Sequence, residues 1–259
     1  MFSTTTGTPI ARISGGRKNG KFLRISNEES DFSGDDLLAM IQSAMREAEF
    51  KVSDGELIIT PSIETERMYI AGKSGCGKST IAARYMVEYL KMFPDRRIFL
   101  FSRHKEEKAY EGIPHQAIEL NDELAESPIE LTEIKNALIV FDDTDNLQDK
   151  RIKKALQLLN DDIISNGRKY NIHCLTLAHQ LLNYKESRNL LNEANRVVFF
   201  NNGTTYHIKN YLQKYAGIDV QMMRKILALK SRWTLISLGY PMYILHDHGA
   251  FLINGSGDD

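Results

Sequence analysis

The spacing of apolar and polar residues changes character partway along the chain. Early segments such as PIARIS and KFLRIS alternate residue by residue, which is typical of strands with one exposed face. Asn19-Gly20 is a turn signal between these two, and FKVSDGELII is expected to form another hairpin with Asp54-Gly55 at its tip. Helical spacing follows Ser33. We therefore expect residues 1–65 to form a small β-rich appendage with one helix.

From Arg67 onward, short apolar runs alternate with amphipathic helical patterns. Strands are expected at 67–71, 97–102, 136–142, 173–178 and 196–200. Helices are expected at 78–92, 149–165, 186–194, 206–215 and 220–229, before closing strands in RWTLISL and MYILHD. This alternation predicts an α/β fold whose mostly parallel sheet has helices on both faces. We assign residues 66–253 to this core and 254–259 to a flexible tail.

The first strand of the core is joined to the first helix by a glycine-rich loop. Gly72–Ser79, GKSGCGKS, matches the phosphate-binding pattern G-x-x-x-x-G-K-[ST]. Its glycines let successive N–H groups point inward, and the helix that follows adds unpaired N–H groups. The residues expected to bind ATP are Gly72, Lys73, Ser74, Gly75, Cys76, Gly77, Lys78, Ser79 and Thr80. The alternative is a glycine-rich turn without a ligand.

Within this loop, two side chains have expected chemical roles. Lys78 can reach the β- and γ-phosphates and act in catalysis, and the Ser79 hydroxyl can ligate Mg²⁺. The expected cofactors are therefore ATP and Mg²⁺.

Two acidic residues, Asp142 and Asp143, end the apolar stretch NALIVFDD. Asp142 and Asp143 should emerge at the carboxyl edge of the sheet, where open α/β sheets bind ligands. We expect Asp142 to hold Mg²⁺ through a water molecule, opposite Ser79, and Asp143 to polarise the attacking water. Asp143 could instead cap the turn that follows.

The strand HCLTLA ends in the polar pair His179-Gln180. A polar pair at this tip can contact a γ-phosphate or the attacking water, so Gln180 is a further candidate catalytic residue. Ordinary surface polarity is the competing interpretation.

The stretch SNGRKYNIHCLTLAHQLLNYKESRNLLNEANRVVFF resembles the HerA–FtsK superfamily of DNA-translocating ATPases. Members carry an Arg, a Gly-Ile-His-like step, a strand ending Ala-Thr-Gln, and a later strand beginning near Arg. The counterparts here are Arg168, Asn171-Ile172-His173, Ala178-His179-Gln180 and Arg196-Val197-Val198. This sequence departs from the pattern at Asn171, His179 and the Asp142-Asp143 pair. Its compact length, its Asp-Asp strand ending and its C-terminal stretch SRWTLISLGYPMYILHDHGAFLI look like the viral branch, the genome-packaging ATPases of large DNA viruses and internal-membrane viruses.

The resemblance, which spans residues 66–253, implies a three-layer P-loop NTPase fold of the RecA/ASCE type. It implies a Mg-dependent ATPase that forms a pentameric or hexameric ring and translocates double-stranded DNA into a capsid. Capsid, portal-vertex or membrane proteins are implied as further partners. In such rings an arginine of one subunit completes its neighbour's site. Arg168 is the first candidate, Arg188 the second and Arg232 a third, against structural or solvated roles for each.

DNA contacts are expected on the helix after the acidic strand. Lys150, Arg151, Lys153 and Lys154 lie away from its apolar stripe. In a ring, copies of these residues would form a basic collar that holds phosphates without reading sequence. In a single chain the same residues would be a solvated helix face. The hairpin tip GGRKNGK is a second basic candidate.

Composition and net charge exclude few of these possible functions. The chain has 259 residues, 33 basic and 34 acidic, with a formal net charge of −1, so bulk charge does not indicate nucleic-acid binding. Two cysteines fit a reducing compartment, the first residues lack signal-peptide features, and apolar runs are too short to span a bilayer. We expect an intracellular location, at viral assembly sites in host cytoplasm or in the virion.

Two other functions remain open from the sequence. A small-molecule kinase would use the same core, with residues 103–125 as a possible acceptor-binding insertion. A nucleotide-gated assembly subunit would bind ATP without appreciable turnover.

Overall fold

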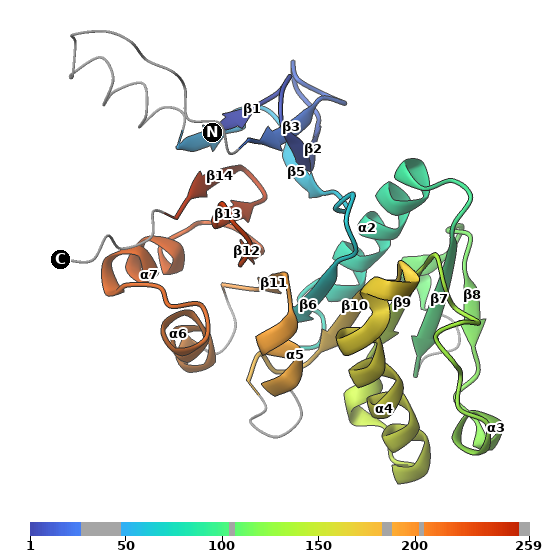
Figure 1. The fold of residues 1–259 in the computed structure, drawn as a ribbon. Coiled ribbons are helices and arrows are strands. Elements are labelled where there is room, and N and C mark those ends of the chain that lie inside the picture. The colour runs from blue at the N-terminus through green and yellow to red at the C-terminus, as the bar shows by residue number, and fades with distance from the viewer. Residues whose placement is uncertain (27–47, 104–106, 183–187, 202–204, 254–259) are drawn as a thin grey trace, which may run out of the picture.

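The computed structural model describes residues 1–26, 48–103, 107–182, 188–201 and 205–253 (Figure 1). It contains a ten-stranded mixed sheet and a separate four-stranded antiparallel sheet. The helix expected after Ser33 and the expected flexible tail lie outside the described residues.

Six neighbouring strands of the large sheet run parallel. They are β11 (Arg196–Phe199), β6 (Arg67–Ala71), β10 (His173–Ala178), β9 (Ala137–Asp142), β7 (Arg97–Ser102) and β8 (Gln116–Ile118), in spatial order. Four antiparallel strands continue the sheet beyond β11: β12 (Thr234–Ser237), β13 (Tyr243–His246), β14 (Gly249–Leu252) and β4 (Glu49–Lys51). The expected mostly parallel sheet is confirmed.

The residues of β6 alternate between two apolar layers, as a strand covered on both faces requires. Met68 and Ile70 belong to the layer that contains α2 (Lys78–Met92). Tyr69 and Ala71 belong to the opposite layer. The helices of that second side are α4 (Lys150–Asn166), α5 (Arg188–Glu193), α6 (Thr205–Lys214) and α7 (Val220–Leu227). The three-layer α/β arrangement is therefore confirmed.

Short helices occupy several of the connections between these elements. They are η1 (Lys108–Tyr110), α3 (Asp122–Glu126), η2 (Thr144–Asn146) and η3 (Gly167–Tyr170). Among the described residues, no helix is both long enough and apolar enough to cross a bilayer.

The small sheet packs beside α2. Its order is β1 (Phe2–Ser3), β3 (Phe22–Ile25), β2 (Thr8–Ser14) and β5 (Glu56–Ile59). Apolar residues of this sheet share one core cluster with α2. Two ion pairs fasten the contact, Arg12 to Glu88 at 2.7 Å and Arg84 to Glu56 at 2.8 Å.

The hairpin expected at FKVSDGELII was wrong. β4 pairs with β14 in the large sheet, whereas β5 pairs with β2 in the small sheet. The reason is packing, because β5 buries Leu57 and Ile59 in the cluster shared with α2. Asp54-Gly55 therefore lies where the chain passes from one sheet to the other.

A buried ion pair joins the amino-terminal ends of β6 and β11. Arg196 Nη1 lies 3.0 Å from Glu66 Oε1, and the two side chains are 7% and 2% exposed. Arg196 also donates to the Thr60 carbonyl, and the Tyr85 hydroxyl donates to Glu66 Oε2 at 2.6 Å. Each charge is thus satisfied only while the others remain in place.

We expect Arg196→Met to lower the free energy of unfolding by about 3–5 kcal/mol, because Glu66 would remain buried without its counter-charge. Lys51→Met, which removes an exposed pair with Glu49, should change it by no more than about 0.5 kcal/mol. Urea titration of both variants measures this. Equal losses would contradict the structural role given to the buried pair.

Candidate functional site

The glycine-rich loop is built so that its backbone turns tightly between β6 and α2. Gly75 and Gly77 have φ of 74° and 105°, which favour glycine. At Gly72, an added Cβ would lie 2.6 Å from both Cys76 Sγ and the Phe200 ring. The loop conformation therefore depends on these three glycines.

Lys78 is held inside this loop. Its side chain is 6% exposed, and Nζ donates to the carbonyls of Gly72 at 2.9 Å and Lys73 at 3.4 Å. The two carbonyl groups are neutral, and the nearby Asp142 carboxylate attracts the same ammonium. An anion bound beside Nζ would compensate the buried charge further.

The hydroxyl of Ser79 faces the acidic strand. Ser79 Oγ donates to Asp142 Oδ2 at 3.2 Å, and the Tyr110 hydroxyl donates to the same oxygen at 2.6 Å. Burial is the largest influence on Asp142 and raises the pKa of its carboxyl group, while the hydrogen bonds from Tyr110 and Ser79 lower that pKa. Both hydrogen bonds thus favour the ionised carboxylate.

This pair of oxygens fits a magnesium ion. Neighbouring ligands of an octahedral Mg²⁺ lie about 3 Å apart, because each bond is about 2.1 Å long. The observed 3.2 Å between Ser79 Oγ and Asp142 Oδ2 is close to that separation. Hydroxyl and carboxylate oxygens are also the ligand type that Mg²⁺ prefers.

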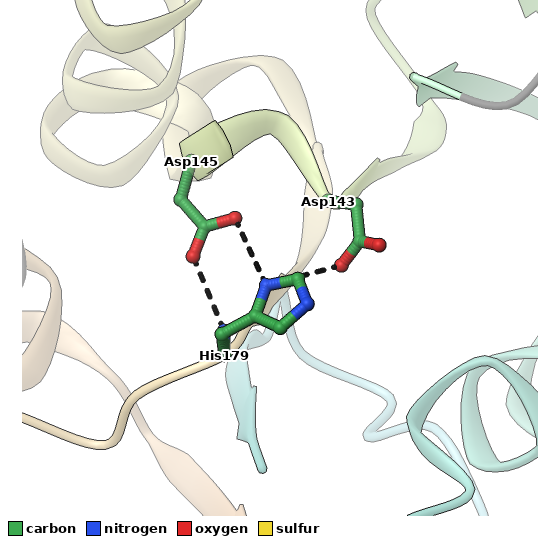
Figure 2. Close-up of side chains that lie close together, drawn as sticks. All are labelled: Asp143, Asp145 and His179. Carbon is green, nitrogen blue, oxygen red and sulfur yellow. Dashed lines mark hydrogen bonds and ion pairs between the residues drawn. The ribbon is translucent and has the colours of Figure 1, made fainter. Parts of the chain in front are cut away.

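Asp143 turns away from the strand toward His179 (Figure 2). Its φ of 53° and ψ of 28° are left-handed, a conformation that Asp tolerates better than most residues. His179 Nδ1 lies 3.4 Å from Asp143 Oδ1 and 3.4 Å from Asp145 Oδ1. The backbone N–H of His179 donates to Asp145 Oδ2 at 3.2 Å. Ligand atoms of the three residues lie within 4.8 Å of one another, close enough to hold a metal ion together.

The capping alternative for Asp143 finds no support in this geometry, because its side chain makes no capping hydrogen bond to η2. Gln180 is exposed just beyond β10 and lines a cavity of about 300 Å³ together with Gly72, Lys73 and Ser74. The structure therefore places Gln180 beside the loop and His179 beside Asp143.

The three candidate arginines lie in different places. Arg168 is exposed in η3, which leads into the amino-terminal end of β10. The glycine-rich loop instead follows the carboxyl end of β6, which runs parallel to β10. Arg168 thus lies at the sheet edge opposite its own loop. Arg188 is the first residue of α5, and its side chain is outside the described set. Arg232 pairs with Glu56 at 2.7 Å and Asp247 at 3.6 Å.

The basic residues expected to touch DNA lie on α4, with Lys153 partly buried and Lys150, Arg151 and Lys154 exposed. Their charge is largely offset. Arg151 pairs with Asp122 at 2.5 Å, Asp149 caps the helix, and Asp161 and Asp162 lie further along it.

By contrast, residues 205–230, which contain α6 and α7, carry five basic residues and one acidic residue. The single acid, Asp219, caps α7. Sequence reasoning missed this local excess, although counting charges helix by helix would have found it.

Tyr110 and Asp145 were also missed. Tyr110 belongs to the connection between β7 and β8, and no motif spacing links it to Asp142. Asp145 is part of DDTDN, which sequence reasoning treated as rich in turn-forming residues. A tertiary contact with His179 distinguishes it from an ordinary turn residue.

No model of a known protein family matches the chain. Uncharacterized protein V3 of the Sputnik virophage is 35% identical over 246 residues, which cover 93% of this chain and 94% of V3. A viral relative agrees with the resemblance to a viral branch.

Two solved structures are similar at low identity. The DNA-packaging ATPase B204 of Sulfolobus turreted icosahedral virus is 15% identical with a TM-score of 0.49, over 71% of this chain and 97% of B204. The conjugation coupling protein TcpA of pCW3 is 13% identical with a TM-score of 0.48, over 93% of this chain and 77% of TcpA. At these values the fold assignment rests on the strand order and the loop themselves.

We expect Tyr110→Phe to move the titration midpoint of Asp142 to higher pH. The hydrogen bond from Tyr110 lowers the pKa of Asp142, whereas Phe keeps the burial that raises it. ¹³C NMR of the Asp142 carboxyl carbon measures the midpoint. Exposed Tyr206 supplies the control variant Tyr206→Phe, and an unchanged or lower midpoint in Tyr110→Phe would refute the assigned role.

Proposed function

This chain belongs to the family of the Sputnik virophage protein V3, and we propose that it is an ATP-hydrolysing motor that translocates double-stranded DNA during viral genome packaging. The observation that carries the proposal is the meeting of Lys78, Ser79 and Asp142 at one sheet edge. A phosphate-binding lysine faces an acidic strand end there, which is the arrangement that phosphoryl transfer requires.

The residues divide the chemistry between them. Loop N–H groups and Lys78 bind the β- and γ-phosphates, with Lys78 exchanging its loop carbonyls for phosphate oxygens. Asp143 accepts a hydrogen bond from the attacking water and so orients it toward the γ-phosphate. His179, at 3.4 Å from Asp143, orients that carboxylate. Mg²⁺, held by Ser79 and Asp142, would offset the phosphate charge.

A ring explains the position of Arg168. Since this side chain lies at the opposite edge from its own loop, it serves only a neighbouring subunit's γ-phosphate. We therefore propose a homo-oligomeric ring in which Arg168 acts across the interface. Arg188 is the alternative, because α5 follows the end of β10 on the loop side. Capsid, portal-vertex or membrane proteins would anchor the ring at assembly sites in the host cytoplasm or in the virion.

DNA contact on α4 remains part of the proposal, but residues 205–230 offer the stronger electrostatic surface. Five basic residues against one acidic residue leave this segment at +4, within a chain of −1. On α4 and its cap, four basic residues are opposed by Asp149, Asp161 and Asp162. Duplex phosphates bind uncompensated positive charge, so α6 and α7 should contribute more to affinity.

A second candidate function, a small-molecule kinase, has one observation in its favour. A cavity of about 720 Å³ beside Asp142 is lined by Tyr110 and by residues of the expected insertion, namely the basic Arg103, Lys108 and His115 and the acidic Glu107, Glu111 and Glu119. A cavity of this volume is large enough for a small-molecule acceptor, and its mixed basic and acidic groups could bind a polar one. The identity of the phosphate acceptor separates this function from the motor.

ATP turnover should rise when duplex DNA is added to the assembled protein and disappear in Lys78→Ala. Asp143→Asn should keep nucleotide binding but lose about 100-fold or more in turnover, because water orientation is lost. Phosphate release across protein concentrations, with and without DNA, measures both. Label appearing on an added nucleoside would favour the kinase, and an unaffected Asp143→Asn variant with negligible turnover would favour a nucleotide-gated assembly subunit.

Replacing Lys209, Lys214 and Lys230 together by Gln should reduce the slope of log affinity for DNA against log salt by about 2–3, since each lost phosphate contact removes about 0.9. The matched triple variant of Lys150, Lys153 and Lys154 should change it less. Fluorescence anisotropy of a labelled duplex provides the measurement. A larger loss of slope in the α4 triple variant would show that α4 makes the main DNA contact. An unchanged slope in both triple variants would exclude both surfaces.

A further inference from the structure

We propose that the cavity between the phosphate loop and the small N-terminal sheet receives the nucleobase of the bound nucleotide. The inference rests on the proposed function, since it requires that the loop bind a nucleoside triphosphate. It adds a role for the N-terminal sheet, which supplies one wall of the nucleotide site.

The direction of the nucleotide follows from the two cavities that loop residues line. One contains Gly72, Lys73 and Ser74 together with His179 and Gln180, and has a volume of about 300 Å³. Asp143, which orients water, lies beside His179 at this side. The terminal phosphate must therefore point toward this first cavity.

The other cavity lies at the opposite end of the loop. It is lined by Cys76, Gly77 and Thr80, and has a volume of about 140 Å³. Neither β9 nor β10 contributes to it. A triphosphate is a linear chain, so when its terminal phosphate points toward Asp143, its nucleoside leaves the loop near Thr80.

The walls of this second cavity suit an aromatic ring. They are formed by Leu57, Ile58 and Ile59 of β5 with Ile81, Phe200 and Trp233. An apolar protein cavity of about 150 Å³ holds one aromatic ring molecule such as benzene, so 140 Å³ matches a base rather than a whole nucleoside. Trp and Phe side chains also stack on any base through its π-face.

Two arginines border the same cavity, and the small sheet fixes both. Arg84 lies 2.8 Å from Glu56 Oε1, and Arg232 lies 2.7 Å from Glu56 Oε2. A guanidinium held in this way can stack on a base or meet the ribose and α-phosphate at the cavity mouth. Arg232, a candidate trans arginine, therefore has a position that suits the nucleoside of its own subunit.

Trp233 provides a direct test because it is the only tryptophan in the chain and is 5% exposed. Two probes are compared in the full-length protein with Mg²⁺: ATP, and inorganic tripolyphosphate, which has the phosphates but no base. Binding is measured by calorimetry, and Trp233 emission is recorded in parallel. We expect ATP to change the emission and to bind about tenfold or more tightly than tripolyphosphate, because tripolyphosphate has no base to stack on the aromatic walls.

Ile58→Phe fills the cavity from the small sheet. It should weaken ATP binding by about tenfold, the factor expected from the loss of base stacking, and leave the affinity for tripolyphosphate unchanged. The control Ile63→Phe alters a 63% exposed isoleucine that does not line the cavity, and should change neither ligand. If Ile58→Phe fails to fold, the comparison in the wild-type protein still decides.

The outcomes separate this inference from the proposed function. Equal affinity for both probes with unchanged Trp233 emission places the base elsewhere and overturns the inference, even if ATP is hydrolysed. Failure to bind either probe overturns both proposals. An emission change with ATP, absent with tripolyphosphate, supports the base site even if DNA has no effect on turnover.

Discussion

The candidate site depends on three parallel strands that end together. β6 carries the phosphate loop, β9 carries the acids, and β10 lies between them, with Ala71 opposite Ala178 and Phe141 opposite Thr176 in the pairing register. This register brings Ser79 within 3.2 Å of Asp142 although 63 residues separate them. A one-residue slip in either pairing would turn the strand ends to the other face of the sheet and separate the loop from its acid.

A buried ion pair at the opposite, amino-terminal ends of the strands gives the sheet the rigidity that the candidate site needs. Glu66 and Arg196 pair at the amino-terminal ends of β6 and β11, buried in a place where neither charge can find water. α2 is then held between the large sheet and the small one, with Arg12 bonded to Glu88 on its outer side. The loop therefore lies between two fixed elements, so its Lys78 is placed before a ligand arrives, which lowers the cost of ordering the site.

Sequence patterns gave the central strands almost to the residue, because strands buried on both faces must be short and apolar and because glycine, lysine and paired acids mark their ends. They did not give the separation of β4 from β5, since alternation shows that a strand exists without showing which sheet it joins. For the site, Lys78, Ser79 and Asp142 were predicted by motif. Tyr110 was not, because it lies in the β7–β8 connection and meets Asp142 of β9 only through the tertiary fold. The choice between His179 and Gln180 beside Asp143 was also beyond the sequence, since adjacent residues at a strand end point in different directions.

The most direct test is a crystal structure of the protein with Mg²⁺ and a non-hydrolysable ATP analogue. We predict phosphates on the backbone N–H groups of residues 72–80, Lys78 Nζ moved from the carbonyls of Gly72 and Lys73 to phosphate oxygens, and Mg²⁺ coordinated by Ser79 on the side of Asp142. An analogue bound away from this loop, or a metal ion remote from both Ser79 and Asp142, would contradict this prediction.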